Sequence, residues 1–171
     1  MFILTLFFVG VNKIVLNDFD IEAFYLCAIH ANIPSYKMAF LLNKHLGIRL
    51  ERAESDVEVT NSEKNKEVYP KYVFEDKTQY IIYTLVKNKC MMDTISTPKS
   101  TNLFITEPST HEIKKLIADY KKVDYFLKIE TEIDTYATKV LVSHILEIKQ
   151  VITSYEVDYS KIKKKTNLIF E

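Results

Sequence analysis

The sequence predicts a single α+β domain: a mixed or antiparallel sheet with about three helices packed on it. Two segments repeat apolar residues at the period of a helix, and several others alternate apolar and polar residues at the period of a strand. The 171 residues, of which 47% are hydrophobic, suffice for one compact core without disulfide or metal staples. Because helices and strands follow one another along the chain, the nearest common architecture is a ferredoxin-like split βαβ arrangement.

The first expected elements are a strand at residues 23–30 and a helix between Pro34 and Gly47. Residues 23–30 are apolar on both faces of a strand, which suits a central strand; they also fit a helix, but we expect a strand. The fixed φ of Pro34 suits a first helical turn, Asn32 can cap it, and Gly47 ends it. The apolar stripe between them consists of Met38, Leu41, Leu42, His45 and Leu46.

A hairpin is expected next, between two exposed loops. Residues 72–74 and 80–86 are rich in aromatic and β-branched side chains and flank a polar turn at residues 76–77. Residues 53–67 and 87–102 are polar and show no period, so we expect loops there.

Before residue 160, the C-terminal half predicts two strands and two further helices. Ser109 and Glu112 have capping-box spacing ahead of apolar residues, which predicts a short helix. Alternation predicts a strand at 123–130 with one face in the core, and another at 151–159. Residues 134–148 carry apolar side chains on one helical face, so we expect a longer helix there.

Residues 1–12 are interpreted as an apolar N-terminal extension of the domain, which spans residues 13–171. The stretch 1–11 has no positive region before its apolar core and no cleavage site after it, so we do not read it as a secretion signal. It is also too short to span a bilayer. We interpret it as an extra leading strand or an over-extended gene start.

Charge and cysteine usage indicate a cytoplasmic protein that does not associate with a membrane. The 23 basic side chains balance the 23 acidic ones, so no long-range field attracts nucleic acid or an anionic membrane. Any charged site is therefore local. Cys27 and Cys90 both lie in apolar surroundings, which suits thiols in a reducing compartment.

One segment carries a family resemblance. Residues 117–125 read Ile-Ala-Asp-Tyr-Lys-Lys-Val-Asp-Tyr, which resembles the bacterial family named for the pattern IPExxxVDY. Ala118 and Asp119 stand where that family has Pro and Glu, and residues 41–47 resemble the family as well. The resemblance covers the chain from about Lys13 onward. Because the family is uncharacterised, it implies no catalytic residues. The positions that agree with the pattern are Ile117, Val123, Asp124 and Tyr125.

The resembling segment supplies three candidate functional residues: Asp124, Tyr125 and Asp119. Asp124 is the polar member of the Val-Asp-Tyr triplet and begins a well-patterned strand. We expect its carboxylate to be structural, accepting hydrogen bonds from backbone amides or a nearby hydroxyl.

Most catalytic and cofactor chemistry finds no support in the sequence, so we assign no catalytic residue, no metal site and no cofactor. The four histidines have no second ligand type at a zinc-like spacing. With only Gly10 and Gly47, the chain has no phosphate-cradling loop and no Gly-x-Ser-x-Gly motif.

We therefore expect a non-enzymatic binding or scaffold module that meets a protein partner through a sheet edge or an aromatic sheet face. One alternative is a small enzyme with a carboxylate-based site around Asp124. A deep cleft containing Asp124 and a histidine favours that enzyme, and a flat surface favours binding.

A second alternative is a weak single-stranded RNA binder, although zero net charge does not favour nucleic acid. It would use aromatic side chains on the sheet together with a run of basic residues. The basic run is also a candidate anion-binding site. It precedes an expected C-terminal strand at 166–170. The aromatic residues are Tyr80, Tyr83, Tyr125, Phe126, Tyr155 and Tyr159. The basic run consists of Lys161, Lys163, Lys164 and Lys165.

Overall fold

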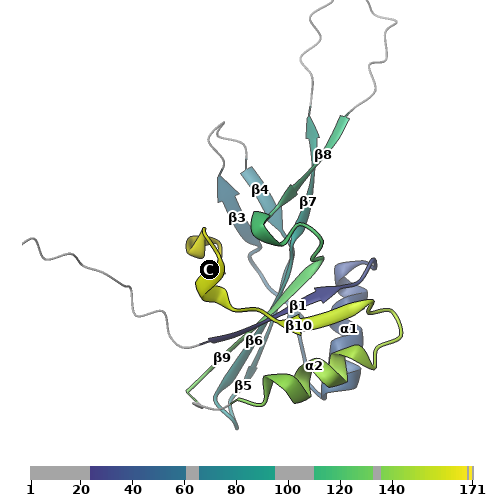
Figure 1. Ribbon diagram of the computed structural model, residues 1–171, viewed down its shortest axis with the longest axis vertical. Coiled ribbons are helices and arrows are strands. Elements are labelled where there is room, and N and C mark those ends of the chain that lie inside the picture. The colour runs from purple at the N-terminus through teal and green to yellow at the C-terminus, as the bar shows by residue number, and fades with distance from the viewer. Residues whose placement is uncertain (1–23, 61–65, 95–109, 133–135, 169, 171) are drawn as a thin grey trace, which may run out of the picture.

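A six-stranded antiparallel sheet forms the centre of the molecule (Figure 1). The computed structural model describes residues 24–60, 66–94, 110–132, 136–168 and 170. In spatial order the strands are β10 (Thr153–Glu156), β1 (Phe24–His30), β9 (Tyr125–Thr131), β6 (Ile81–Lys87), β5 (Lys71–Asp76) and β2 (Glu51–Arg52). Two smaller sheets pair β3 (Val57–Thr60) with β4 (Lys66–Tyr69) and β7 (Lys89–Thr94) with β8 (Thr110–Lys115).

Two α-helices, α1 (Ser35–Leu46) and α2 (Thr138–Leu146), pack on one face of the large sheet (Figure 1). α1 follows β1, and α2 connects β9 to β10. β9 lies between β1 and β6 and is antiparallel to both, so β1 and β6 run parallel to each other. The described residues also form three short 3-10 helices: η1 (Ala118–Tyr120), η2 (Tyr159–Lys161) and η3 (Lys165–Leu168).

The large sheet is buried on both faces because its central strands are apolar on both. Alternate residues of β9, such as Leu127 and Ile129, pack against the two helices in one core. Phe126, between them, faces a second core on the opposite side. We had expected a single core face for this strand. The covering residues of the second core include Leu116, Ile117, Val123, Val157, Ile162, Leu168 and Phe170.

The expectation of about three helices was wrong. The molecule is mostly β, and α1 and α2 are the α-helices of the described residues. Where the capping-box spacing predicted a helix, residues 110–115 form β8 instead and pair with β7 along their whole length. Capping is a local preference, whereas pairing with β7 satisfies the backbone groups of six consecutive residues. Six strands and two added small sheets also exceed the four strands of a ferredoxin-like unit.

Other expectations were confirmed in part. Residues 24–30 are a strand, and α1 ends at Gly47, whose φ of 70° is left-handed. No side chain caps the start of α1, so Asn32 does not have the capping role we expected. The segments expected as loops contain β3, part of β4 and β7. Residues 165–168 form η3, where we expected the strand at 166–170.

None of the helices in the described ranges is long and apolar enough to cross a membrane, and the extension at residues 1–12 lies outside those ranges.

Candidate functional site

The site is built around Asp124, the last residue before β9. Its backbone N–H donates to the carbonyl of Ile29 at 3.1 Å. Its Oδ2 accepts the N–H of Ala31 at 3.0 Å, and its Oδ1 pairs with the ammonium of Lys89. The side chain of Asp124 is only 12% exposed and that of Lys89 is 34% exposed, so the ion pair is partly buried. Asp124 therefore fixes the chain where β1 ends.

Tyr125 acts on the same stretch of chain. Its hydroxyl donates to the carbonyl of Ile33, two residues beyond Ala31. Burial, together with the nearby charge of Asp124, raises the pKa of Tyr125, so the hydroxyl keeps its proton and remains a donor. Two neighbouring side chains thus hold the connection between β1 and α1 in place.

Asn88, a residue that the sequence analysis missed, holds the segment of residues 117–124 in place. It lies between β6 and β7 and is fully buried. Its amide nitrogen donates to the carbonyls of Tyr120 at 3.1 Å and Val123 at 3.0 Å, and its side-chain oxygen accepts the N–H of Ile117 at 2.9 Å. Its backbone N–H also donates to the carbonyl of Asp124 at 2.8 Å. Most of its hydrogen-bonding capacity is therefore used to shape residues 117–124.

A hollow of about 210 Å³ opens beside Asp124. Lys87 and Lys89 contribute its cationic side chains, and no histidine or arginine is among the described residues that line it. Lys115 lies across the β7–β8 pair from Lys89. Burial and the charge of Lys89 lower the pKa of Lys115, while the charge of Asp124 acts in the opposite direction. The lining residues are Ala31, Asn32, Ile33, Lys87, Lys89, Ile113, Asp124 and Tyr125.

Asp119, the third candidate, lies apart from this hollow. It is exposed in η1, and its carboxylate accepts the backbone N–H of Lys163 at 3.1 Å. The structure therefore brings Asp119 to the basic run instead of to Asp124. In that run Lys161 pairs with Asp158 at 3.2 Å.

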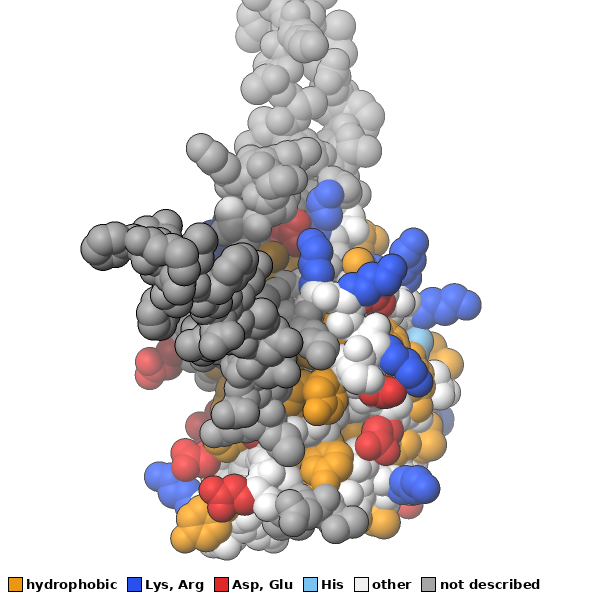
Figure 2. Space-filling model, turned by 60° about the vertical axis from the view of Figure 1, so that its left-hand side comes forward, with side chains coloured by type: hydrophobic (Ala, Val, Ile, Leu, Met, Phe, Trp, Pro, Cys, Tyr) orange, Lys and Arg blue, Asp and Glu red, His pale blue; other side chains and the backbone are white. Residues whose placement is uncertain are grey.

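The rest of the basic run lies near the C-terminal end of the described chain. Lys163 and Lys164 are exposed, and Lys165 begins η3. Figure 2 shows Lys and Arg side chains gathered in the upper right of one face. A net charge of zero therefore coexists with a local positive surface.

The aromatic residues considered for RNA binding do not share one open face. Tyr83, Tyr125 and Phe126 are buried. The other members of the set come from separate elements. Tyr80 lies in the β5–β6 turn, Tyr155 lies on the edge strand β10 beside His30, and Tyr159 packs on Phe24 with ring centroids 4.6 Å apart.

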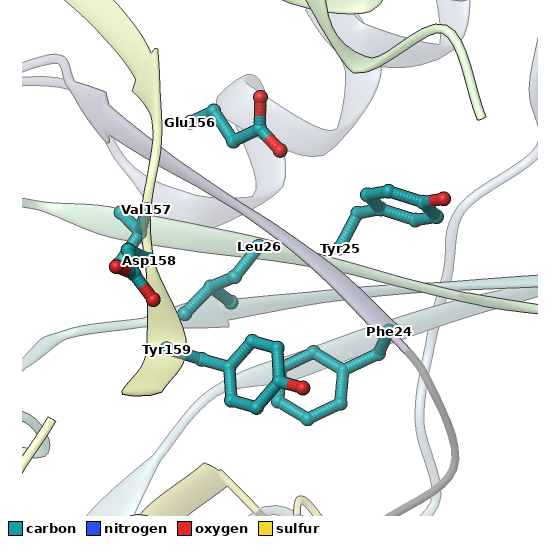
Figure 3. Close-up of a pocket in the computed structure, with 7 residues that line it drawn as sticks. All are labelled: Phe24, Tyr25, Leu26, Glu156, Val157, Asp158 and Tyr159. Atoms are coloured by element: carbon teal, nitrogen blue, oxygen red, sulfur yellow. The ribbon is translucent and has the colours of Figure 1, made fainter. Parts of the chain in front are cut away.

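A second hollow, of about 390 Å³, lies where β10 ends beside β1 (Figure 3). In Figure 3, Phe24 and Tyr159 lie together on one side of the β1 ribbon, with Tyr25 and Glu156 on the other. Asp158 accepts hydrogen bonds from the N–H and hydroxyl of Ser160, which with Lys161 lower its pKa. The charged side chains that line this hollow are carboxylates, those of Glu156 and Asp158. The hollow beside Asp124, in contrast, is lined by two lysines.

Metal and thiol chemistry find little support in the described part of the chain. No three His, Cys, Asp or Glu residues there come together as metal ligands. Cys27 is completely buried, and this burial, followed by the charge of Glu156, raises the pKa of its thiol to about 12. A thiol with that pKa is not a nucleophile at neutral pH. Comparison with protein-family models, curated proteins and solved structures finds no match for this chain.

Proposed function

We propose that this protein is a binding module that recognises a partner protein through the outer face of α1. The observation that supports this is a pair of aromatic side chains, Tyr36 and Phe40, which are 68% and 64% exposed. Residues four apart lie on the same face of a helix. Aromatic side chains contribute a large share of binding energy at protein interfaces.

The charges on α1 indicate the chemistry of the partner surface. Lys37 and Lys44 are exposed on the same helix, and α1 has no acidic residue in its first turn. An apolar depression with acidic side chains around it would complement this face, since interfaces combine an apolar centre with a polar rim.

The large sheet offers less surface than α1. Both of its faces are covered, one by the helices and the other by the second core. Its outer strands, β10 and β2, are four and two residues long, so each edge presents few backbone groups for an added strand. We therefore assign recognition to the helix instead of the sheet edge or sheet face considered from the sequence.

An enzyme built on Asp124 has weaker support than a binding module. The carboxylate already accepts a backbone N–H and pairs with Lys89, so it is not poised to take a proton from a substrate. The adjacent hollow has no histidine among its described lining residues. We place the binding module in the cytoplasm, in keeping with the thiol state of Cys27 and Cys90.

The test is affinity capture from the native cell extract with three forms of the full chain as bait. The parent is compared with a Tyr36→Ser/Phe40→Ser variant and with a control variant, Val140→Ser/Ile152→Ser. The control residues are 54% and 76% exposed on α2 and the loop after it, so both variants replace two exposed apolar side chains.

We expect a partner that is retained by the parent and the control and lost with the α1 variant. Melting temperatures should agree among the three forms, because exposed side chains contribute little to stability. Retention of the same proteins by all three forms would contradict the proposal.

A further inference from the structure

The hollow beside Asp124 has a surplus of positive charge. Lys87 and Lys89 line it, and Lys115 is the cross-strand partner of Lys89. The only carboxylate among its described lining residues is that of Asp124, which already pairs with Lys89. Positive charges from β6, β7 and β8 therefore lie close together, and the described residues that line the hollow do not supply a matching number of anions.

This convergence is unfavourable in the unliganded protein. Partial burial and the nearby charge of Lys89 lower the pKa of Lys115, the cross-strand partner of Lys89. Like charges near a partly buried site repel more strongly than in bulk water. A bound anion would relieve the repulsion, so the cluster is suited to an anionic ligand.

The residue types favour phosphate over carboxylate. Arginine is the usual choice for two-pronged recognition of a carboxylate, and the described lining contains none. Lysines bind phosphate as point charges, and a phosphate monoester carries close to two negative charges at neutral pH. Two such charges match the surplus that remains after Lys89 is paired with Asp124.

The size of the hollow limits the ligand. At about 210 Å³ it is smaller than the sites that enclose drug-sized molecules, which measure roughly 300 to 1,000 Å³. It can take the phosphate end of a ligand while the remainder stays outside. Ile113, which is 53% exposed, lines the hollow and offers apolar surface to that remainder.

We propose that the hollow formed by Lys87, Lys89 and Asp124, with Lys115 beside it, binds a phosphate group, either as free orthophosphate or as the monoester of a small molecule. Asp124 holds Lys89 in position, and residues 31–33 line the hollow as well. This site is separate from the aromatic face of α1 assigned to a protein partner.

The test is isothermal titration calorimetry of the full chain at constant ionic strength. Orthophosphate and phenyl phosphate are the probes, and acetate is the monoanion control. We expect saturable binding of one phosphate probe per chain and none of acetate. Tighter binding of phenyl phosphate would indicate an ester as the ligand, and equal binding would indicate free phosphate; both outcomes support the site.

Variants locate the binding. Lys115→Gln leaves the ion pair of Lys89 with Asp124 in place, and it should weaken phosphate binding roughly tenfold or more. Lys164→Gln makes the same charge change on the exposed basic run and should leave the affinity unchanged. Lys87→Gln provides a second variant at the hollow if Lys115→Gln melts below the assay temperature.

Two results would overturn the proposal. One is the absence of saturable phosphate binding at millimolar concentration. The other is an equal loss of affinity in Lys164→Gln and in the variants at the hollow, because a uniform loss would show that only the overall charge of the protein attracts phosphate.

Discussion

Asp124 and Tyr125 are adjacent in sequence and hold neighbouring points of another segment. Asp124 accepts the N–H of Ala31, and Tyr125 donates to the carbonyl of Ile33. Val123, before them, is buried in the second core. We propose that Asp124 and Tyr125 of the Val-Asp-Tyr triplet shape the junction between β1 and α1.

Replacing Asp124 by Asn tests this structural role. The amide keeps the shape and can still accept the N–H of Ala31, but it loses the charge that pairs with Lys89. We expect the free energy of unfolding to fall by about 1 to 3 kcal/mol, seen as a lower denaturant midpoint at unchanged slope. The matched control is Asp119→Asn, whose exposed carboxylate accepts one backbone N–H, from Lys163.

An unchanged or higher midpoint for Asp124→Asn would contradict the structural role. Residues held in place for function often cost stability, so that outcome would make Asp124 the leading functional residue.

The sequence could predict part of this residue-level picture. Asp124 is a polar residue at the start of an apolar strand, which predicted that its carboxylate accepts a hydrogen bond. The carboxylate does accept one, from the N–H of Ala31. Asn88 could not be found in the same way. A single asparagine in a polar stretch looks like a turn residue, and only the folded chain brings the carbonyls of Tyr120 and Val123 to its amide.

At the scale of the element, α1 shows which local signals are reliable. Its C-terminal end was predicted because Gly47 can adopt a left-handed backbone, and the structure has it at φ 70°. The following turn is then held by Asn43, whose side chain exchanges two hydrogen bonds with the backbone of Leu50, at 3.0 and 2.7 Å. Asn43 gives no sequence signal of this role, because its partner is determined by the turn.

A substitution at Gly47 isolates the backbone contribution. A Cβ at this position meets no heavy atom within 4 Å, so the cost of Gly47→Ala is conformational and not steric crowding. Left-handed backbone costs an L-residue about 1 to 2 kcal/mol, and reduced freedom of the unfolded chain offsets about 0.4 to 1 kcal/mol of it. We expect a net loss of about 1 kcal/mol in urea unfolding.

Gly47→Asn is the control, since asparagine tolerates the left-handed region better than alanine. It should lose less stability than Gly47→Ala. A Gly47→Ala protein as stable as the parent would show that the helix end relaxes out of the left-handed conformation.

The strands show the limit of local patterns. β1, β6 and β9 were predicted because their own side chains carry the signal. β7 and β8 were missed because their sequences are largely polar and show no alternation. The two segments form strands by pairing with each other. Cross-strand pairing is a property of two segments, and neither one displays it alone.

At the scale of the whole molecule, both faces of one sheet are used to build the core. The predicted alternation of residues 123–130 suggested one buried face, yet even Lys128 is 9% exposed and its ammonium pairs with Glu130 at 2.5 Å. The second core is covered by residues that follow β10 and residues that precede β9, together with Val57 of β3 and Tyr69 of β4. Irregular segments have no period, so their role as a covering layer could not be predicted.

A shortened chain tests where the folded unit begins. The apolar stretch of residues 1–11 ends before Asn12 and Lys13, so a protein beginning at Lys13 should keep a cooperative melt close to that of the parent. Differential scanning calorimetry compares the two. A chain beginning at Leu26 is the control; it lacks the ring contact between Phe24 and Tyr159 and should melt at a lower temperature. A molten or insoluble product from Lys13 would show that earlier residues complete the core.

The order of the strands also governs how the protein is made. Of the described strands, β1 leaves the ribosome first, but its neighbours in the sheet are β9 and β10, and Ser154 bonds to Ala28 across 126 residues of sequence. At about 5 to 20 residues per second, β1 waits roughly 6 to 25 seconds for that partner. Until β9 has been made, this apolar strand has both edges open, a state that favours association with other chains. The synthesis of β9 and β10, and not that of the first helix, therefore sets the moment at which the large sheet can form around β1.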